Sequence, residues 1–152
     1  MRSRILTCAG GALRQQRGEF VCTHVACAGC SRVGENVAAI AVATALQALR
    51  LDTCGLSDFP TAAVTGLPHL STLVLDNNAI PGLPVPPLAA LAALEELHVR
   101  NNALTALPPQ LSLLPRLRTL QVEGNMLRTI RRSVLDRGSP ALLEYLHSRL
   151  PL

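Results

Sequence analysis

One pattern recurs four times in this sequence and restricts the folds that the chain can adopt. Five positions repeat with the spacing LxxLxLxxN/CxL, and the leading leucines are 24, 24 and 23 residues apart. The four sets are Leu46, Leu49, Leu51, Cys54 and Leu56; Leu70, Leu73, Leu75, Asn78 and Ile80; Leu94, Leu97, Val99, Asn102 and Leu104; and Leu117, Leu120, Val122, Asn125 and Leu127. A unit of this size cannot bury an apolar face alone, so we expect the units to stack around one continuous core.

This spacing is the signature of leucine-rich repeats. The longer pattern LPxxLxxLxxLxxLxVxxNxL resembles the intracellular leucine-rich repeats of the Ras-group and scaffold type. The expected fold class is α/β: a leucine-rich-repeat solenoid, a right-handed superhelix, with parallel strands on its concave side and a C-terminal capping helix. From Gly124 the run GNMLRTIRRSVLDRGSPALLEYLHSRLP resembles the C-terminal cap of the leucine-rich repeat-containing protein 40 family.

The pattern divides the chain into four parts. Residues 46–127 hold the four repeats, and residues 128–152 form the C-terminal cap. The apolar residues 35–45 are expected to form an N-terminal capping helix over the first repeat. Residues 1–34 show no convincing periodicity, and we expect them to be disordered or to act as a targeting segment.

The C-terminal cap should be an amphipathic helix. Ser139 and Pro140 suit the N-cap and the first turn. The leucines that recur at helical spacing are Leu142, Leu143, Leu146 and Leu150. Upstream lies a basic cluster of Arg128, Arg131, Arg132 and Arg137. Guanidinium groups suit an acidic partner or phosphate, but we favour a solvating role at the edge of the fold.

The Asn or Cys of each repeat turns the chain out of its strand. A buried Asn side chain can satisfy backbone N–H and C=O groups that the turn leaves without partners. A buried thiol is an accepted substitute in this slot. We therefore expect a structural turn ladder of Cys54, Asn78, Asn102 and Asn125.

Residues between and just after the core leucines should face the concave surface, because side chains alternate along a strand. They fall into three columns: Arg50, Val74, His98 and Gln121; Asp52, Asp76, Arg100 and Glu123; and Ala48, Thr72, Glu96 and Thr119. The expected partner-binding residues are Arg50, Asp52, Thr72, Asp76, Glu96, His98, Arg100, Gln121 and Glu123. At the centre of this face we place Asp76, His98, Arg100 and Glu123.

The charge distribution and the motifs favour binding of a protein partner over binding of a nucleic acid or catalysis. The formal charge is −2 over residues 46–127 and +3 in each flanking part, which gives +4 in total, and aromatic residues make up only 2%. Nucleic-acid binders normally carry a basic stripe on the working face. The sequence lacks GxSxG, GxxxxGK[ST], HExxH and a dinucleotide glycine fingerprint. We expect a non-catalytic scaffold or adaptor in signal transduction, without cofactors.

The sequence also bears on location. The longest uncharged stretch near the start, residues 36–49, has 14 residues and is too short to span about 30 Å of hydrocarbon as a helix. We therefore expect no membrane span and a cytoplasmic protein. The first eighteen residues bear Arg and no acid, so an organelle transit peptide is the alternative. The chain should be monomeric if its N-terminal cap is sound.

Two alternatives to a self-sufficient module remain open. The chain could be the truncated tail of a longer leucine-rich-repeat protein. It could also carry a metal- or redox-active N-terminal segment, because Cys22, Cys27 and Cys30 have the CxxxxCxxC spacing of plant-type iron-sulfur proteins, with His24 nearby. Against a metal, Cys54 is committed to the repeat core, and four ligands within nine residues fall short of two separated pairs. We expect thiols in a reducing compartment instead.

Overall fold

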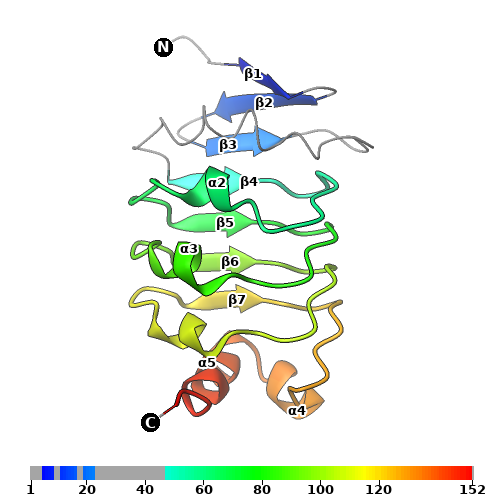
Figure 1. Cartoon of the computed structure of the whole chain (residues 1–152), viewed down its shortest axis with the longest axis vertical. Coiled ribbons are helices and arrows are strands. Elements are labelled where there is room, and N and C mark those ends of the chain that lie inside the picture. Colours follow the sequence, from blue (N-terminus) through cyan, green and yellow to red (C-terminus); the bar gives the residue numbers. More distant parts are fainter. Residues whose placement is uncertain (1–4, 9–10, 17–18, 23–46, 152) are drawn as a thin grey trace.

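One sheet runs the length of the described chain (Figure 1). The computed structural model describes residues 5–8, 11–16, 19–22 and 47–151. Seven strands lie in chain order from β1 to β7. They are β1 (Ile5–Cys8), β2 (Gly11–Gln16), β3 (Glu19–Cys22), β4 (Ala48–Arg50), β5 (Thr72–Val74), β6 (Glu96–His98) and β7 (Thr119–Gln121).

The strands of the repeats pair in parallel and in register. Leu49 of β4 lies opposite Leu73, which lies opposite Leu97, and Leu97 lies opposite Leu120. Equal positions of the motif therefore stack, as a repeat of near-constant length requires. Each strand is only three residues long, so the side chains on either face form short columns.

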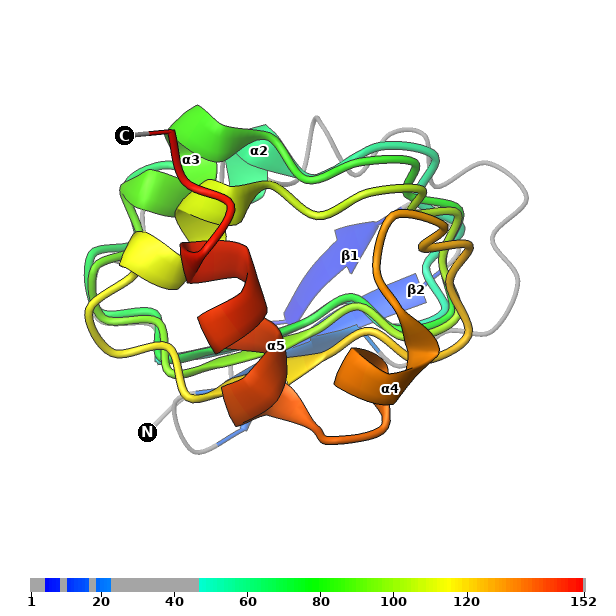
Figure 2. The same cartoon turned by 90° about the horizontal axis from the view of Figure 1, so that it is seen from below.

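Short helices return the chain on the opposite side of each coil from the strands (Figure 2). They are α2 (Thr61–Val64), α3 (Val85–Ala89) and the 3-10 helix η2 (Pro109–Leu113). Each is preceded by proline, at positions 60, 84 and 108, because the fixed φ angle of proline suits the start of a helix. Helices of four or five residues are not stable alone, so the core must hold them.

The core between the strands and the helices is aliphatic and continuous. It contains every apolar motif residue from Leu49 to Leu127, as the repeat pattern predicts, and also helix residues such as Val64, Leu88 and Leu111. Leu46 lies outside the described residues. A fully buried leucine contributes about 1.5–3 kcal/mol relative to an exposed one. Burial of the helix leucines in the common core therefore stabilises these short helices more than their own helix propensity does.

Two helices follow the last repeat, α4 (Arg132–Leu135) and α5 (Ser139–His147). Helix α5 lies across the end of the last coil (Figure 2). Its Leu142 and Leu146 join the aliphatic core, and Leu143 and Tyr145 pack against it.

The predicted role of Ser139 as an N-cap is wrong. Gly138 is the N-cap residue, with φ 82°, and Ser139 begins the helix. The Ser139 Oγ instead accepts a hydrogen bond from Leu120 N at 2.9 Å and donates one to Leu120 O at 3.1 Å. Strand β7 is the last strand of the sheet, and its outward N–H and C=O groups need such partners.

Residues 5–8, 11–16 and 19–22 form strands, although we expected disorder in this part of the chain. Strands β1 and β2 pair antiparallel, as do β2 and β3, and β3 pairs in parallel with β4. The antiparallel pairs are joined by two residues each, with Gly10 and Gly18 in the sequence, a length and composition that favour hairpins. The periodicity of such short strands is too brief to detect. The expected capping helix at 35–45 lies outside the described residues.

Candidate protein-binding face of the sheet

The side chains of β4 to β7 that point away from the core form one surface, which we call the sheet face. It comprises the three columns at positions 48, 72, 96 and 119; 50, 74, 98 and 121; and 52, 76, 100 and 123. Backbone hydrogen bonds carry the alignment past the strand ends, from Thr53 N to Asp76 O at 2.9 Å and from Asn77 N to Arg100 O at 2.9 Å. The register thus brings the nine predicted binding residues onto one surface.

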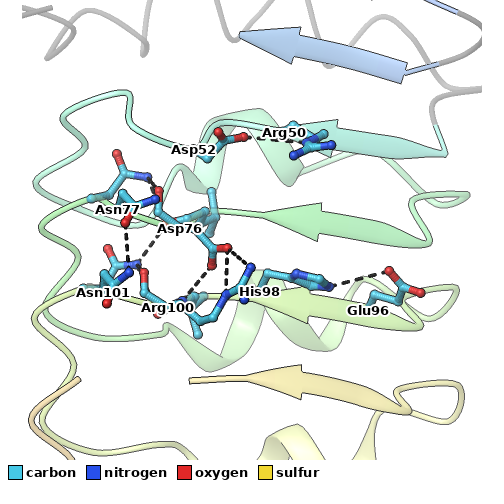
Figure 3. Close-up of polar contacts among 12 residues, drawn as sticks. Arg50, Asp52, Asp76, Asn77, Glu96, His98, Arg100 and Asn101 are labelled. Carbon is cyan, nitrogen blue, oxygen red and sulfur yellow. Dashed lines mark hydrogen bonds and ion pairs between the residues drawn. The ribbon is translucent and has the colours of Figure 1, made fainter. Parts of the chain in front are cut away.

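The shortest contacts on the sheet face join Asp76 to Arg100 (Figure 3). Asp76 Oδ1 accepts from the Arg100 backbone N at 2.7 Å, and Oδ2 accepts from Arg100 Nε at 3.1 Å and Nη2 at 2.8 Å. These bonds, and the charges of Asp76 and Glu123, raise the pKa of the Arg100 guanidinium above its usual value, although desolvation opposes the shift. Arg100 therefore stays charged over the whole working pH range.

The Asp76–Arg100 pair changes the role that we expected for Asp76. Only 6% of this residue is exposed, and both carboxylate oxygens already accept hydrogen bonds from Arg100. Asp76 is thus a positioning residue for Arg100, and it offers no free surface for direct contact. The Arg100 side chain is 44% exposed and remains accessible.

Two other charged pairs on the sheet face are looser (Figure 3). Arg50 Nε lies 3.7 Å from Asp52 Oδ1, and His98 Nε2 lies 3.6 Å from Glu96 Oε2. Both distances exceed those of hydrogen bonds. Asp52 Oδ1 and His98 Nε2 are themselves buried and have no hydrogen-bond partner among the residues that the structure describes.

The remaining positions of the sheet face vary in exposure. Gln121 and Thr72 are half-buried and Glu123 is exposed, and Gln121 Oε1 is a third buried atom without a hydrogen-bond partner in the described chain. Val74 and Ala48 are each 7% exposed although neither belongs to the aliphatic core. Taller neighbours therefore shield them, and the polar side chains form the accessible part of the face.

The Asn of each turn bonds the backbone of its own repeat and of the one before. Asn78 Oδ1 accepts from Cys54 N at 3.1 Å and Leu56 N at 3.0 Å. Its Nδ2 donates to Leu51 O and to Leu75 O, each at 2.9 Å. One side chain thus satisfies groups of two neighbouring coils, which fits the structural role that we expected for this residue.

Asn102 and Asn125 make the same kinds of contact one and two repeats further along. Asn102 Oδ1 accepts from Ile80 N at 3.1 Å, and Asn125 Oδ1 accepts from Leu104 N at 3.1 Å. Both Nδ2 atoms also donate to Val99 O, at 3.1 Å from Asn102 and 2.8 Å from Asn125. In the first repeat the Cys54 thiol donates to Asp52 O, two residues earlier, at 3.5 Å. Asn102 donates to the equivalent carbonyl of its own repeat, Arg100 O.

A second row of turn residues was not among our predictions. The residue before each ladder position has positive φ: 57° at Thr53, 57° at Asn77, 52° at Asn101 and 74° at Gly124. Asn101 Nδ2 donates to Asn77 Oδ1 at 2.9 Å (Figure 3). The left-handed region favours Gly and Asn. An Asn or Gly directly before the ladder residue, as at Asn77, Asn101 and Gly124, could therefore have predicted this row from the sequence.

The other sequence-based candidates lie apart from these contacts. Cys22 ends β3, whereas His24, Cys27 and Cys30 lie outside the described residues. Within the described ranges, no three His, Cys, Asp or Glu residues are grouped so that they could hold a metal ion. The four arginines of the basic cluster, Arg128, Arg131, Arg132 and Arg137, are all exposed. None of the helices in the described part has the length and apolar character to cross a membrane.

Comparison with known proteins agrees with this geometry. Residues 44–104 match the family model for leucine-rich repeats. Among solved structures, the chain is similar to a leucine-rich-repeat protein of Leptospira interrogans, with a TM-score of 0.53 and 27% sequence identity over 70% of this chain. The match covers 25% of that protein, so the chain spans about a quarter of its length. The chain therefore contains leucine-rich repeats and has the α/β fold of that class.

Proposed function

We propose that the chain is a non-catalytic protein-interaction module that binds a protein partner through the sheet face. The observation that carries this proposal is the register of β4 to β7, which aligns twelve outward positions into one surface. Leucine-rich repeats generally act as protein-interaction modules, and such repeats present their strands as the binding surface. The half-exposed Arg100, held by Asp76, gives this surface a fixed cationic group at its centre.

The finer features of the module belong to the same proposal. Helix α5 acts as a cap that closes the end of a right-handed solenoid, supported by its buried Leu142 and Leu146. The likeness of residues 124–152 to the cap of the leucine-rich repeat-containing protein 40 family supports it as well. We place the module in the cytoplasm, as a scaffold or adaptor, on its resemblance to intracellular repeats.

The size of the sheet face limits the affinity. Four strands at a spacing of about 4.8 Å give a surface roughly 15 Å long. A standard interface buries about 800 Å² on each partner, so β4 to β7 alone support weak binding. Stronger binding requires a partner that also reaches β1 to β3, which continue the same sheet.

Site-specific photocrosslinking tests the proposal. A photoreactive amino acid replaces Thr72 or Gln121 on the sheet face, or the exposed Ala89 on α3 as the matched control. We expect one partner to be captured at Thr72 and Gln121 and not at Ala89. Equal capture from all three positions, or capture from Ala89 alone, would contradict binding through the sheet face.

Charge reversal on the sheet face provides the second arm. Glu123→Arg should weaken binding of the captured partner, whereas Thr105→Arg, at an exposed site outside the sheet face, should not. Arg100 is unsuitable for this purpose, because its replacement leaves the buried Asp76 without its cationic partner and would destabilise the fold. Unchanged binding by the Glu123→Arg variant, together with equal capture at Ala89 and on the sheet face, would count against the proposal.

A further inference from the structure

The charge left on the sheet face after its internal pairs are formed indicates what it binds. Six charged residues lie there, two arginines and four carboxylates, which gives a formal charge of −2. Arg100 is bonded to Asp76 at 2.8 Å, and Arg50 lies 3.7 Å from Asp52. Glu96 and Glu123 remain: neither forms an ion pair with an arginine among the described residues, and Glu96 lies 3.6 Å from His98 Nε2.

Hydrogen bonding on the same surface is unbalanced toward acceptors. Asp52 Oδ1, Gln121 Oε1 and His98 Nε2 are buried atoms without hydrogen-bond partners among the described residues. A carboxylate and an amide oxygen can only accept, and a neutral imidazole nitrogen can accept as well. Buried polar atoms are normally bonded, so rotation of these side chains toward an occupant that donates N–H groups would satisfy them.

Two of these three atoms, and both glutamates without an arginine partner, lie on or beside the adjacent strands β6 and β7. His98 of β6 lies directly opposite Gln121 of β7, and Glu96 precedes His98 on the same face of its strand. Glu123 follows Gln121 in the same way and lies in the column of Arg100. The two glutamates therefore flank the His98–Gln121 pair from opposite ends. Figure 3 shows Glu96 and His98 side by side, with Arg100 on the other side of His98.

We infer that the sheet face binds a short basic segment of its protein partner, with one cationic side chain beside Glu96 and another beside Glu123. The segment's N–H groups then donate to His98 and Gln121. At about 3.3 Å per residue, some four or five extended residues cover the four strands. The inference rests on the proposed function, and it adds the chemistry of the partner.

The test uses hexaarginine amide as the probe and the full chain, labelled with ¹⁵N. We expect the backbone amides of residues 96–100 and 119–123 to shift on titration and to saturate. Hexaglutamate should leave these amides unshifted. Shifts confined to other residues, or shifts of the sheet face with hexaglutamate, would overturn the inference.

Matched double variants separate local from overall charge. Glu96→Gln with Glu123→Gln should raise the Kd for hexaarginine about threefold to tenfold, since each exposed ion pair contributes modestly. The control combines Asp58→Asn with Glu144→Gln, which removes the same charge from exposed positions outside the sheet face. It should leave the Kd within about twofold. An equal rise of the Kd in both double variants would contradict the inference, because binding would then depend on the net charge of the protein alone.

A failure of this inference can be distinguished from a failure of the proposed function. If Thr72 and Gln121 crosslink a partner whose binding is unaffected by the Glu96 and Glu123 variant, the basic segment is wrong and the binding face stands. If neither position crosslinks any partner and hexaarginine shifts nothing on the sheet face, both proposals fall. Capture of a partner and a selective loss in the variant would support both.

Discussion

Thr53 is the residue least suited to its backbone conformation in the repeats. It occupies the left-handed turn position that holds Asn77, Asn101 and Gly124 in the next three repeats, with φ 57°. A β-branched side chain is rare in this region because Cβ crowds the backbone. The turn nevertheless forms, because Thr53 N is bonded to Asp76 O at 2.9 Å and the neighbouring coil fixes it.

Thr53→Asn should therefore stabilise the protein by roughly 0.5–1 kcal/mol. The new side chain would also extend the row in which Asn101 Nδ2 donates to Asn77 Oδ1. Chemical denaturation gives the free energy of unfolding. The matched control is Gly124→Asn, which should destabilise, because a Cβ at 124 would collide with the side chain of Asn101. Destabilisation by Asn at 53 would refute this view of the turn.

The buried Asn102 side chain forms hydrogen bonds with four backbone groups. Its side chain bonds Ile80 N and three carbonyl groups, those of Leu75, Val99 and Arg100. Asn102→Ala would leave the buried Ile80 N without its partner, whereas the three carbonyl groups keep Asn78, Asn125 and Asn77 as donors, so we expect a loss of about 1–3 kcal/mol of stability. Thr105→Ala, at an exposed position nearby, should cost less than about 0.5 kcal/mol. Similar losses from the two substitutions in a urea melt would argue against a structural role for the ladder.

The sequence predicted the role of a residue where every repeat gives that position the same surroundings. It did not do so where the role depends on a side chain of the adjacent repeat. The motif identified Asn102 as buried because every repeat places that position under the next turn. It could not separate Asp76 from Asp52, which share a column, since the difference arises from Arg100 in the adjacent repeat. Pair contacts across a sheet depend on both partners, and the spacing within one repeat describes only one of them.

At the scale of elements, Ser139 closes the last strand of the sheet. Its hydroxyl bonds both Leu120 N and Leu120 O, so one side chain takes the place of a further strand at that point of β7. Ser139→Ala should cost about 1–2 kcal/mol, because both groups lose their partner. Amide hydrogen exchange at Leu120 should accelerate in the same variant.

The control for Ser139 is Ser133→Ala in α4, where the side chain is exposed. Ser139→Thr should retain most of the stability because it keeps the hydroxyl. If Ser139→Ala speeds exchange throughout the chain and not first at Leu120, the serine acts on global stability and has no local role at the edge.

Helix α5 shows which features a local sequence pattern can predict and which it cannot. Apolar periodicity located the buried side of α5 correctly, since Leu142 and Leu146 are each 2% exposed. It misassigned Ser139, because a serine before an apolar helix is usually an N-cap. The strand that Ser139 serves lies 19 residues earlier in the chain. Local sequence signals do not register such a distant partner.

The whole molecule is a linear stack in which each coil contacts mainly its neighbours. Strands β1 to β3 continue the sheet beyond β4 in the same way that Ser139 and α5 close it beyond β7. This part was missed because hairpin strands lack the period of the repeats, and their place in the sheet follows from the pairing of β3 with β4. In such a stack, the stability of an end depends on what covers it.

Deletion of residues 1–22 should therefore expose the backbone edge of β4, which pairs with β3 through Ala48, Leu49 and Arg50. We expect a lower melting temperature, because the first coil loses its nearest-neighbour contacts. We also expect concentration-dependent self-association, because an uncovered strand edge is a template for pairing. Light scattering coupled to size exclusion measures the second effect and a thermal melt the first. A shortened chain that stays monomeric and melts like the full chain would show that β1 to β3 do not stabilise the first repeat. The contacts of β4 with β5 would then be sufficient to hold that end of the sheet.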